Sequence, residues 1–268
     1  MKKKIMKAFI SCMIIVGISG CKSANSNAGK SASDRGSTIV FGMAKSNAPY
    51  SYYKNGKLTG YDIEAARAIA KKMGYKAKFK VMNSALLTKA LDQGEIDATG
   101  NQQVVEYLLN TKKDEKPPYW FTPEYKFSRL VVVARSSNTS IKHFDDMRNL
   151  KMAMTTGDFF EQSVLSDGGI IVPCKDFDEC VDKVLNNQAA GTMNDLQTYQ
   201  YYHNKYPGKK VKPVVISASL FPMTFMLSQE NEDLSNKMTS AINSLQSNGT
   251  FTKISMKYFH QDISRKDR

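Results

Sequence analysis

The sequence predicts a two-lobed α/β protein whose lobes are joined by two linking strands. Two stretches, residues 38–98 and 151–216, each alternate strand patterns with amphipathic helix patterns, which is typical of an α/β sheet. After the second stretch the chain returns to a long amphipathic helix pattern that ends at Gly249. With 268 residues, the chain is long enough for two lobes that each bury a core.

The first unit contains the patterns of a βαβ arrangement with short connections. Its first helix is well marked, because Asp62 opens it and Gly74 closes it. The expected elements are a strand at 38–44, the helix at 62–73, a half-buried strand at 75–81, a helix at 86–93, a short strand at 96–98, a polar segment at 101–124 and a strong strand at 130–134.

The second unit repeats the alternation after a loop at 136–140, which is a crossing point between lobes. Its expected elements are a strand at 151–154, a loop at 155–158, a helix at 159–165, a strand at 170–172, a helix at 177–185, a strand at 190–193, a loop at 194–195, a tyrosine-rich helix and a strand at 211–216.

The N-terminal residues have the pattern of a targeting segment. Four lysines in the first seven residues precede an apolar run at 8–18, which is too short to span a bilayer as a helix. The run ends in Ile18-Ser19-Gly20-Cys21, which resembles a bacterial lipobox. We therefore expect residues 1–20 to be a signal peptide, Cys21 to carry lipid on the extracytoplasmic face of the cell membrane, and 22–37 to be a tether. A plain signal peptide with an incidental cysteine is the alternative.

Composition excludes several classes of protein. The chain is 41% hydrophobic and has only 16 glycines, so it is neither disordered nor collagen-like. About a third of the net charge of +13 lies in the expected signal peptide, and no stretch interleaves basic and aromatic residues, which argues against nucleic acid as a partner. The three histidines show no metal-ligand spacing, so no metal and no cofactor is predicted. Cys174 and Cys180 can pair in an oxidising compartment, and the spacing leaves this open.

Four motifs in order resemble the solute-binding proteins of polar amino-acid ABC importers, extracellular family 3. The resemblance covers residues 38–264 and implies a periplasmic-binding-protein-like fold of type II. It places lobe 1 at 38–132 plus 217–268, and lobe 2 with its hinge strands at 133–216. The motifs are Ala48-Pro49-Tyr50-Ser51-Tyr52, Gly56-Lys57-Leu58-Thr59-Gly60-Tyr61-Asp62, Leu91-Asp92-Gln93-Gly94-Glu95-Ile96-Asp97-Ala98, and Asn248-Gly249-Thr250 followed by Lys257-Tyr258-Phe259.

The resemblance also implies roles for residues in the cleft between the lobes. Tyr50 would cover the ligand side chain, and the acid of Asn194-Asp195 would pair with the ligand ammonium. Thr155, Thr156 and Gly157 would receive the ligand carboxylate at a helix N-terminus. Polar groups for the ligand head would also come from a segment reminiscent of the cystine-binding branch, namely Asn101, Gln102 and Gln103.

Two departures from the family pattern concern the ligand carboxylate. The family's arginine is missing, since no Arg occurs between Asn101 and Tyr125, and lysines cannot reproduce its planar bidentate fork. Asp158 follows Gly157 where the family commonly has Thr, and an acid facing the cleft there would repel a carboxylate. These departures argue against an ordinary L-α-amino acid head group and leave open a ligand with extra amines, a cationic or dipeptide-like solute, or a weakly bound one.

The function expected from the resemblance is binding without catalysis. The chain would be a monomer that closes on an amino acid or similar small polar solute and delivers it to an ABC permease and ATPase, which are separate chains. One alternative is a dehydratase-like enzyme on the same scaffold, with Glu106 and Glu161 as its candidate acids. The other is an adhesin or sensor.

Overall fold

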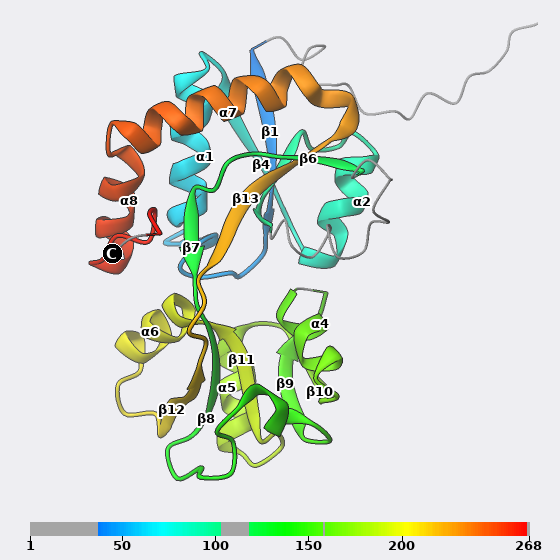
Figure 1. Cartoon of the computed structure of the whole chain (residues 1–268), viewed down its shortest axis with the longest axis vertical. Coiled ribbons are helices and arrows are strands. Elements are labelled where there is room, and N and C mark those ends of the chain that lie inside the picture. The colour runs from blue at the N-terminus through cyan, green and yellow to red at the C-terminus, as the bar shows by residue number, and fades with distance from the viewer. Residues whose placement is uncertain (1–36, 103–117, 158, 267–268) are drawn as a thin grey trace, which may run out of the picture.

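The computed structural model describes residues 37–102, 118–157 and 159–266, and it arranges them in two lobes (Figure 1). Each lobe is built around its own β-sheet, and helices flank both sheets. The first lobe contains the early strands and the C-terminal helices, whereas the second lobe is one continuous stretch from Leu130 to Ile216. The predicted two-lobed α/β fold is therefore confirmed.

Strands from both halves of the chain form the sheet of the first lobe: β1 (Thr38–Ala44), β4 (Lys76–Met82), β5 (Ala98–Gln102), β6 (Tyr119–Phe121), β7 (Lys126–Ser128) and β13 (Phe221–Ser228). Their order is β4-β1-β5-β13-β6, and β7 also pairs with β13. β1 runs parallel to β4 and β5, whereas β13 is antiparallel to its partners. The strand expected at 96–98 starts at Ala98, so Asn101 and Gln102 lie inside β5 rather than after it.

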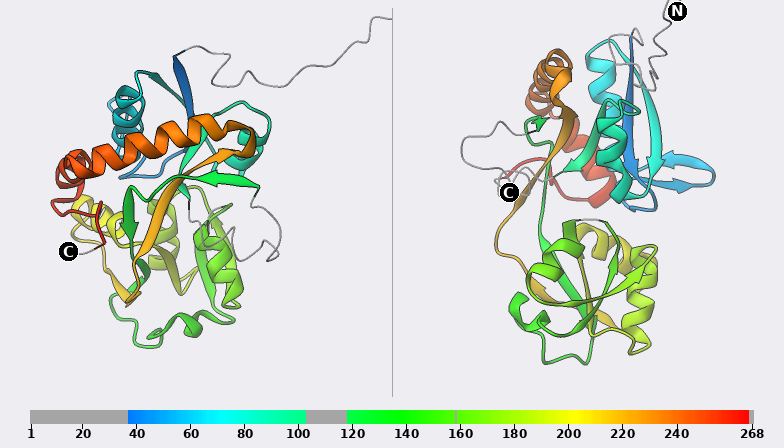
Figure 2. Two further views of the ribbon diagram at one scale, coloured as in Figure 1. Left: turned by 45° about the horizontal axis from the view of Figure 1, so that its top comes forward. Right: turned by 90° about the vertical axis from the view of Figure 1, so that its right-hand side faces the viewer.

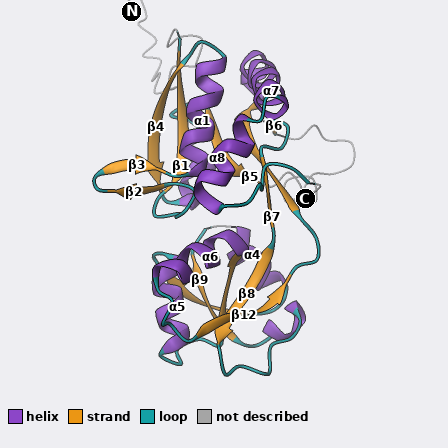
Figure 3. Ribbon diagram, turned by 90° about the vertical axis from the view of Figure 1, so that its left-hand side faces the viewer, coloured by secondary structure: helices purple, strands orange, loops and turns teal. Residues whose placement is uncertain are grey.

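Helices cover both faces of this sheet: α1 (Tyr61–Lys72), α2 (Leu87–Asp92), α7 (Glu232–Ser247) and α8 (Thr250–Phe259), with short 3-10 turns η1 (Ser84–Leu86) and η3 (Gln229–Asn231). α1, α7 and α8 pack against one another on one face (Figure 3). There they bury Phe41 of β1 and Phe225 of β13, while α2 covers Val40 and Met226 on the other face. A separate hairpin joins β2 (Tyr52–Lys54) to β3 (Lys57–Thr59).

The second lobe contains a five-stranded sheet in the order β10-β9-β11-β8-β12, in which β8 is antiparallel to both of its neighbours. Val131 and Val133 of β8 face α5 and α6, whereas Leu130 and Val132 face α4. Its elements are β8 (Leu130–Arg135), η2 (Phe144–Met147), β9 (Lys151–Thr155), α4 (Phe159–Ser166), β10 (Ile170–Cys174), α5 (Phe177–Leu185), β11 (Gly191–Asp195), α6 (Leu196–Lys205) and β12 (Val211–Ile216).

Two chain segments cross between the lobes, one from β7 to β8 and the other from β12 to β13 (Figure 2). The Arg129 side chain ties them together, because its guanidinium donates to the carbonyl oxygens of Ser217 at 3.0 Å and Ala218 at 2.7 Å. β8 belongs entirely to the second sheet, so the lobe boundary expected at residue 133 falls inside β8. The second lobe begins three residues earlier, at Leu130. The crossing expected at the loop 136–140 is therefore wrong, because this loop follows β8 and lies within the second lobe.

Candidate solute-binding cleft

A cavity of about 710 Å³ lies between the lobes. The first lobe contributes the loop that follows β1 and the η1 turn. The second lobe contributes the β9–α4 loop, the end of β10 with the start of α5, and the end of β11. The lining residues used below are Lys45, Asn47, Asp62, Asn83, Ala85, Thr155, Thr156, Gly157, Cys174, Lys175, Asp176, Asn194 and Thr198. This volume is within the usual range for small-molecule sites.

The β9–α4 loop brings the second lobe into contact with the first. Gly157 has φ +80°, and a Cβ built on it would lie 2.3 Å from the Cβ of Ala85 in η1. Only glycine fits both this backbone conformation and this close approach. The Gly157 N–H donates to the Glu161 carboxylate at 2.7 Å. In this structure, the amide that was expected to receive the ligand carboxylate therefore donates to Glu161, an acid of the protein itself.

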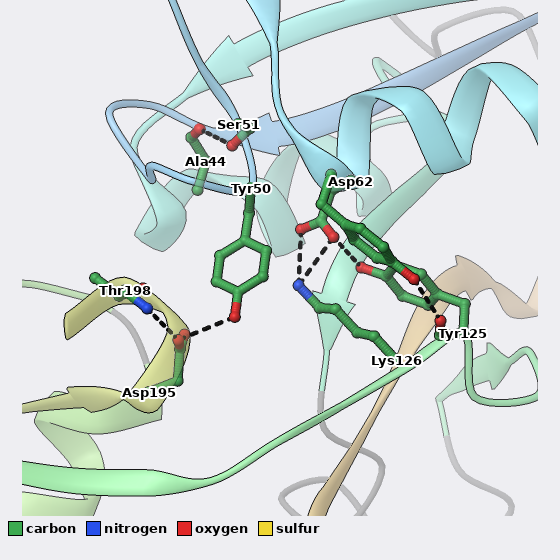
Figure 4. A network of polar contacts seen from close by, with 9 residues as sticks. Ala44, Tyr50, Ser51, Asp62, Tyr125, Lys126, Asp195 and Thr198 are labelled. Atoms are coloured by element: carbon green, nitrogen blue, oxygen red, sulfur yellow. Dashed lines mark hydrogen bonds and ion pairs between the residues drawn. The ribbon is translucent and has the colours of Figure 1, made fainter. Parts of the chain in front are cut away.

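The Asp195 carboxylate accepts hydrogen bonds from both lobes. It is the last residue of β11 and the N-cap of α6, where its carboxylate accepts from the Thr198 N–H at 2.8 Å. The hydroxyl of Tyr50, from the first lobe, donates to the same oxygen at 2.9 Å (Figure 4). Burial raises the pKa of Asp195 above its ordinary value of 3.8, although both donors and the charge of Lys126 act in the opposite direction.

Lys126 is the buried cation beside this contact. Its side chain is fully buried, and its ammonium forms an ion pair with Asp62 at 2.9 and 3.1 Å. The Tyr125 hydroxyl also donates to Asp62 at 2.9 Å. The ammonium lies 3.4 Å from the centre of the Tyr50 ring, within reach of a cation–π interaction (Figure 4). Burial lowers the pKa of Lys126, and the neighbouring Asp62 opposes that effect.

Together these residues form a buried cluster that joins the lobes, which we call the interlobe cluster: Tyr50, Asp62, Tyr125, Lys126 and Asp195. The cluster contains two carboxyl groups and one ammonium. Asp62 has the ammonium as a direct partner, whereas Asp195 accepts from two neutral donors, the Tyr50 hydroxyl and the Thr198 N–H. A further positive charge at this end of the cavity would therefore be stabilised.

Four residues predicted for the site line the cavity: Thr155, Thr156, Gly157 and Asn194. Tyr50 and Asp195 lie behind the wall, 1% and 3% exposed. The loop expected at 194–195 is instead the end of β11, and this places Asn194 in the wall and Asp195 at the helix cap. Asn101 and Gln102 are in β5, with side chains outside the described part of the structure. Cys21, Gln103, Glu106 and Asp158 are outside the described residues altogether.

The two cysteines whose pairing the sequence left open, Cys174 and Cys180, are both buried and both thiols. Cys174, the last residue of β10, belongs to the cavity wall, whereas Cys180 lies in α5. No disulfide joins them in the structure.

Sequence reasoning missed the ion pair and part of the wall. Asp62 was recognised as the start of a helix and as the last residue of the motif Gly56–Asp62, but not as the partner of a buried cation. The local sequence does not identify Lys126, the first residue of β7, as buried, because a single lysine at the start of a strand usually lies in solvent. Asn47 and Ala85 come from turns, where residue type gives little indication of a neighbour in the other lobe.

None of the described helices is long and apolar enough to cross a membrane. Within the same part of the chain, no group of three or more His, Cys, Asp or Glu side chains is placed to hold a metal ion.

A family model for bacterial extracellular solute-binding proteins, family 3, matches residues 39–261. The chain belongs to this family. Family 3 membership agrees with the two lobes, the paired crossing segments and the cavity between them.

Two relatives illustrate the range of similar proteins within family 3. A probable amino-acid ABC transporter-binding protein of Haemophilus influenzae is 27% identical over 229 residues, which cover 85% of this chain and 87% of the relative. The L-cystine-binding protein TcyA of Bacillus subtilis is 23% identical over 274 residues, covering 98% of this chain and all of the relative. Both are named as binding proteins.

Two of the similar solved structures, each 27% identical to this chain, illustrate different states of ligand binding. An ancestral arginine-binding protein bound to arginine aligns with a TM-score of 0.73 over 83% of this chain and 98% of that one. The L-cystine receptor of Neisseria gonorrhoeae, in its unliganded open conformation, aligns with a TM-score of 0.57 over 90% and 98%.

Proposed function

We propose that this chain is the solute-binding component of an ABC importer for an amino acid or a similar small polar solute, with L-cystine among the candidates. Lipid on Cys21 holds it on the extracytoplasmic face of the cell membrane, after residues 1–20 are removed. It closes on its solute as a monomer and delivers it to a permease and an ATPase, which are separate chains. It carries out no catalysis and needs no cofactor.

The observation that carries this proposal is a cavity whose walls come from both lobes, next to a buried interlobe cluster. A solute in such a cavity contacts both lobes at once, so its binding stabilises the closed arrangement. Tyr50 from the first lobe and Asp195 from the second already meet at the end of this cavity. Solute binding and lobe closure therefore act on the same residues.

The interlobe cluster supports a solute with a positive charge. Its two carboxyl groups share one ammonium, and Asp62 reaches the cavity wall. A solute ammonium close to Asp62 and Asn194 adds the missing positive charge and gains hydrogen bonds that offset its loss of water. Tyr50 and Asp195 would then act from behind the wall, through the cluster, rather than by covering the solute.

The solute carboxylate has two kinds of partner in the wall. Thr155 and Thr156 offer polar groups at the end of β9, in the loop expected for this role. Lys45 and Lys175 line the cavity from opposite lobes and are exposed, so each can turn its ammonium inward. In our proposal they supply the positive charge that the family's missing arginine would otherwise provide.

A thermal-shift screen of the full chain tests the binding function. The panel contains the standard amino acids, L-cystine, dipeptides and diamines. A solute present at a hundredfold excess over its dissociation constant should stabilise the fold by about 2.7 kcal/mol. Solutes whose ammonium is acetylated serve as matched controls and should give a smaller shift. The binding proposal is wrong if no member of the panel shifts the transition.

Importer function and anchoring need separate tests in cells. Deleting the gene should abolish uptake of the labelled solute, whereas unchanged uptake with lost adhesion or signalling would favour the adhesin or sensor. A Cys21→Ser variant should release the protein from the membrane fraction into the medium and leave solute binding by the purified chain unchanged. Membrane retention of that variant would contradict the lipid anchor.

A further inference from the structure

The proposed function assigns no role to two neighbouring cysteines, one in the cavity wall and one in the core of the second lobe. Cys174 is the last residue of β10, and Cys180 lies in the second turn of α5, which packs against β10. Both are thiols, with exposed fractions of 8% and 1%. They lie close enough for the Cys180 thiol to form a hydrogen bond to the sulfur of Cys174.

The two thiols differ in access to the cavity. Cys174 forms part of the wall beside Lys175 and Asp176, so a solute in the cavity can reach it. Cys180 is not among the lining residues and packs in the core with Val181 and Val184. A reagent in the cavity therefore meets Cys174 first, and Cys180 lies directly behind it.

The surroundings of Cys174 favour its thiolate, which is the reactive form of a cysteine. The hydrogen bond from Cys180 and the positive charge of Lys183 lower the pKa of the Cys174 thiol, while burial and the nearby acids Asp176 and Glu179 oppose the shift. Lys183 is fixed in place, because its ammonium donates to the carbonyl oxygen of Pro173 and pairs with Glu179 at 3.4 Å.

We propose that Cys174 and Cys180 form a reactive dithiol in the cavity wall, which is oxidised by a low-molecular-mass disulfide that enters the cavity. The Cys174 thiolate attacks one sulfur of the disulfide, whose S–S bond breaks, and one half leaves as a thiol with the proton given up by Cys174. The Cys180 thiolate then attacks the Cys174 sulfur and expels the second half, which is protonated to a thiol. In total, two protein thiols are oxidised to one disulfide and one small disulfide is reduced to two thiols.

The product ties the end of β10 to α5, next to Lys175 and Asp176 in the wall. The reaction requires only that the cavity admits a disulfide. It therefore does not depend on which solute the importer takes up, and the two proposals can fail independently.

The test uses the full chain with Cys12 and Cys21 replaced by Ser, so that Cys174 and Cys180 are the remaining cysteines. The reduced protein is mixed with L-cystine or with glutathione disulfide and followed by intact mass spectrometry. We expect loss of two hydrogens with no lasting adduct, together with release of two small thiols for each chain. Comparing the reaction of L-cystine with that of glutathione disulfide distinguishes a disulfide that binds tightly in the cavity from one that only reacts there.

Single substitutions distinguish the attacking from the resolving thiol. In the same background, Cys180→Ser should accumulate a mixed disulfide on Cys174, and Cys174→Ser should react about tenfold more slowly, because the remaining thiol is buried. The proposal is overturned if Cys180→Ser forms no adduct with either disulfide, or if Cys174→Ser reacts as fast as the parent. Circular dichroism of each variant verifies that the fold is kept, so that fast reaction of Cys174→Ser cannot be attributed to exposure of Cys180 by unfolding.

Discussion

The interlobe cluster contains two buried carboxyl groups, one from each lobe, and they differ in their hydrogen-bond and charge partners. Asp62 of the first lobe has a full positive charge at 2.9 Å and a tyrosine hydroxyl at the same distance. Asp195 of the second lobe accepts from a tyrosine hydroxyl and a backbone amide, and burial raises its pKa. The first lobe thus neutralises its acid internally, whereas the acid of the second lobe has no cation as a hydrogen-bond partner and receives one of its two hydrogen bonds from the first lobe.

The most disruptive change should be loss of the cation from the first-lobe pair. Lys126→Met leaves Asp62 buried without its charged partner, which we expect to cost roughly 3–5 kcal/mol of unfolding free energy in urea titrations. The double variant Asp62→Asn with Lys126→Met should recover much of this loss, because no unpaired charge remains. A loss below about 1 kcal/mol for Lys126→Met would show that Asp62 does not depend on Lys126.

Removing the bond between the lobes should have a smaller effect. Tyr50→Phe deletes the hydroxyl that reaches Asp195 across the cleft, and we expect a loss of about 1–3 kcal/mol in the same titration. Tyr53→Phe is the matched control, because it removes the same hydroxyl from a neighbouring tyrosine that is 61% exposed. Equal losses for the two variants would mean that the Tyr50–Asp195 bond contributes nothing special.

The approach of the two lobes at Gly157 gives a third test. Gly157→Ala and Gly168→Ala both place a Cβ at φ +80°, which should cost about 1 kcal/mol each. Only Gly157→Ala pushes against the other lobe, since the new Cβ at Gly168 meets the flexible side chain of Arg148 at 3.3 Å.

For Gly157→Ala we therefore expect a larger radius of gyration by small-angle X-ray scattering and about tenfold weaker binding of the solute found in the thermal-shift screen, equivalent to 1.4 kcal/mol. Gly168→Ala should leave both quantities unchanged. Equal affinities for the two variants would contradict a role for this contact in closure.

The smallest effect should appear as pH dependence. Because the folded-state pKa of Asp195 is raised, its contribution to stability is fully present below the ordinary value of 3.8 and is lost as pH rises through the folded-state pKa. Wild-type protein should therefore lose stability relative to Asp195→Asn as pH increases through that window. A bound solute with an ammonium should reduce the difference, whereas an acetylated one should not. A pH-independent difference between the two proteins would contradict the raised pKa.

The order of strands and helices could be predicted because it depends on local periodicity. The helix at 177–185 and the strand at 211–216 have the bounds expected from the sequence. The interlobe cluster could not be predicted in this way, because Tyr50 and Asp195 are 145 positions apart and meet only when the sheets are placed. Local residue type also suggested a loop at 194–195, where pairing with β8 extends β11 to Asp195.

The family resemblance placed the wall of the site better than its interior. Thr155, Thr156, Gly157 and Asn194, which were carried over by their position in the family, line the cavity. Lys126 was missed because the free energy of burying a lysine is favourable only with a partner such as Asp62, and that partner lies 64 positions away. Buried charge pairs are formed by tertiary structure, so no single segment reveals them.

The second lobe is inserted as one continuous stretch into the first, and this determines the order in which the lobes can finish folding. The N-terminal strands β1 and β5 are covered by Phe225 of β13 and by helix residues such as Met238 and Phe251, all of which follow the second lobe in the chain. During synthesis, residues 130–216 have all their partners before the first lobe does. The half that begins the chain is therefore the last to be completed, and until then its apolar surface must be protected from aggregation.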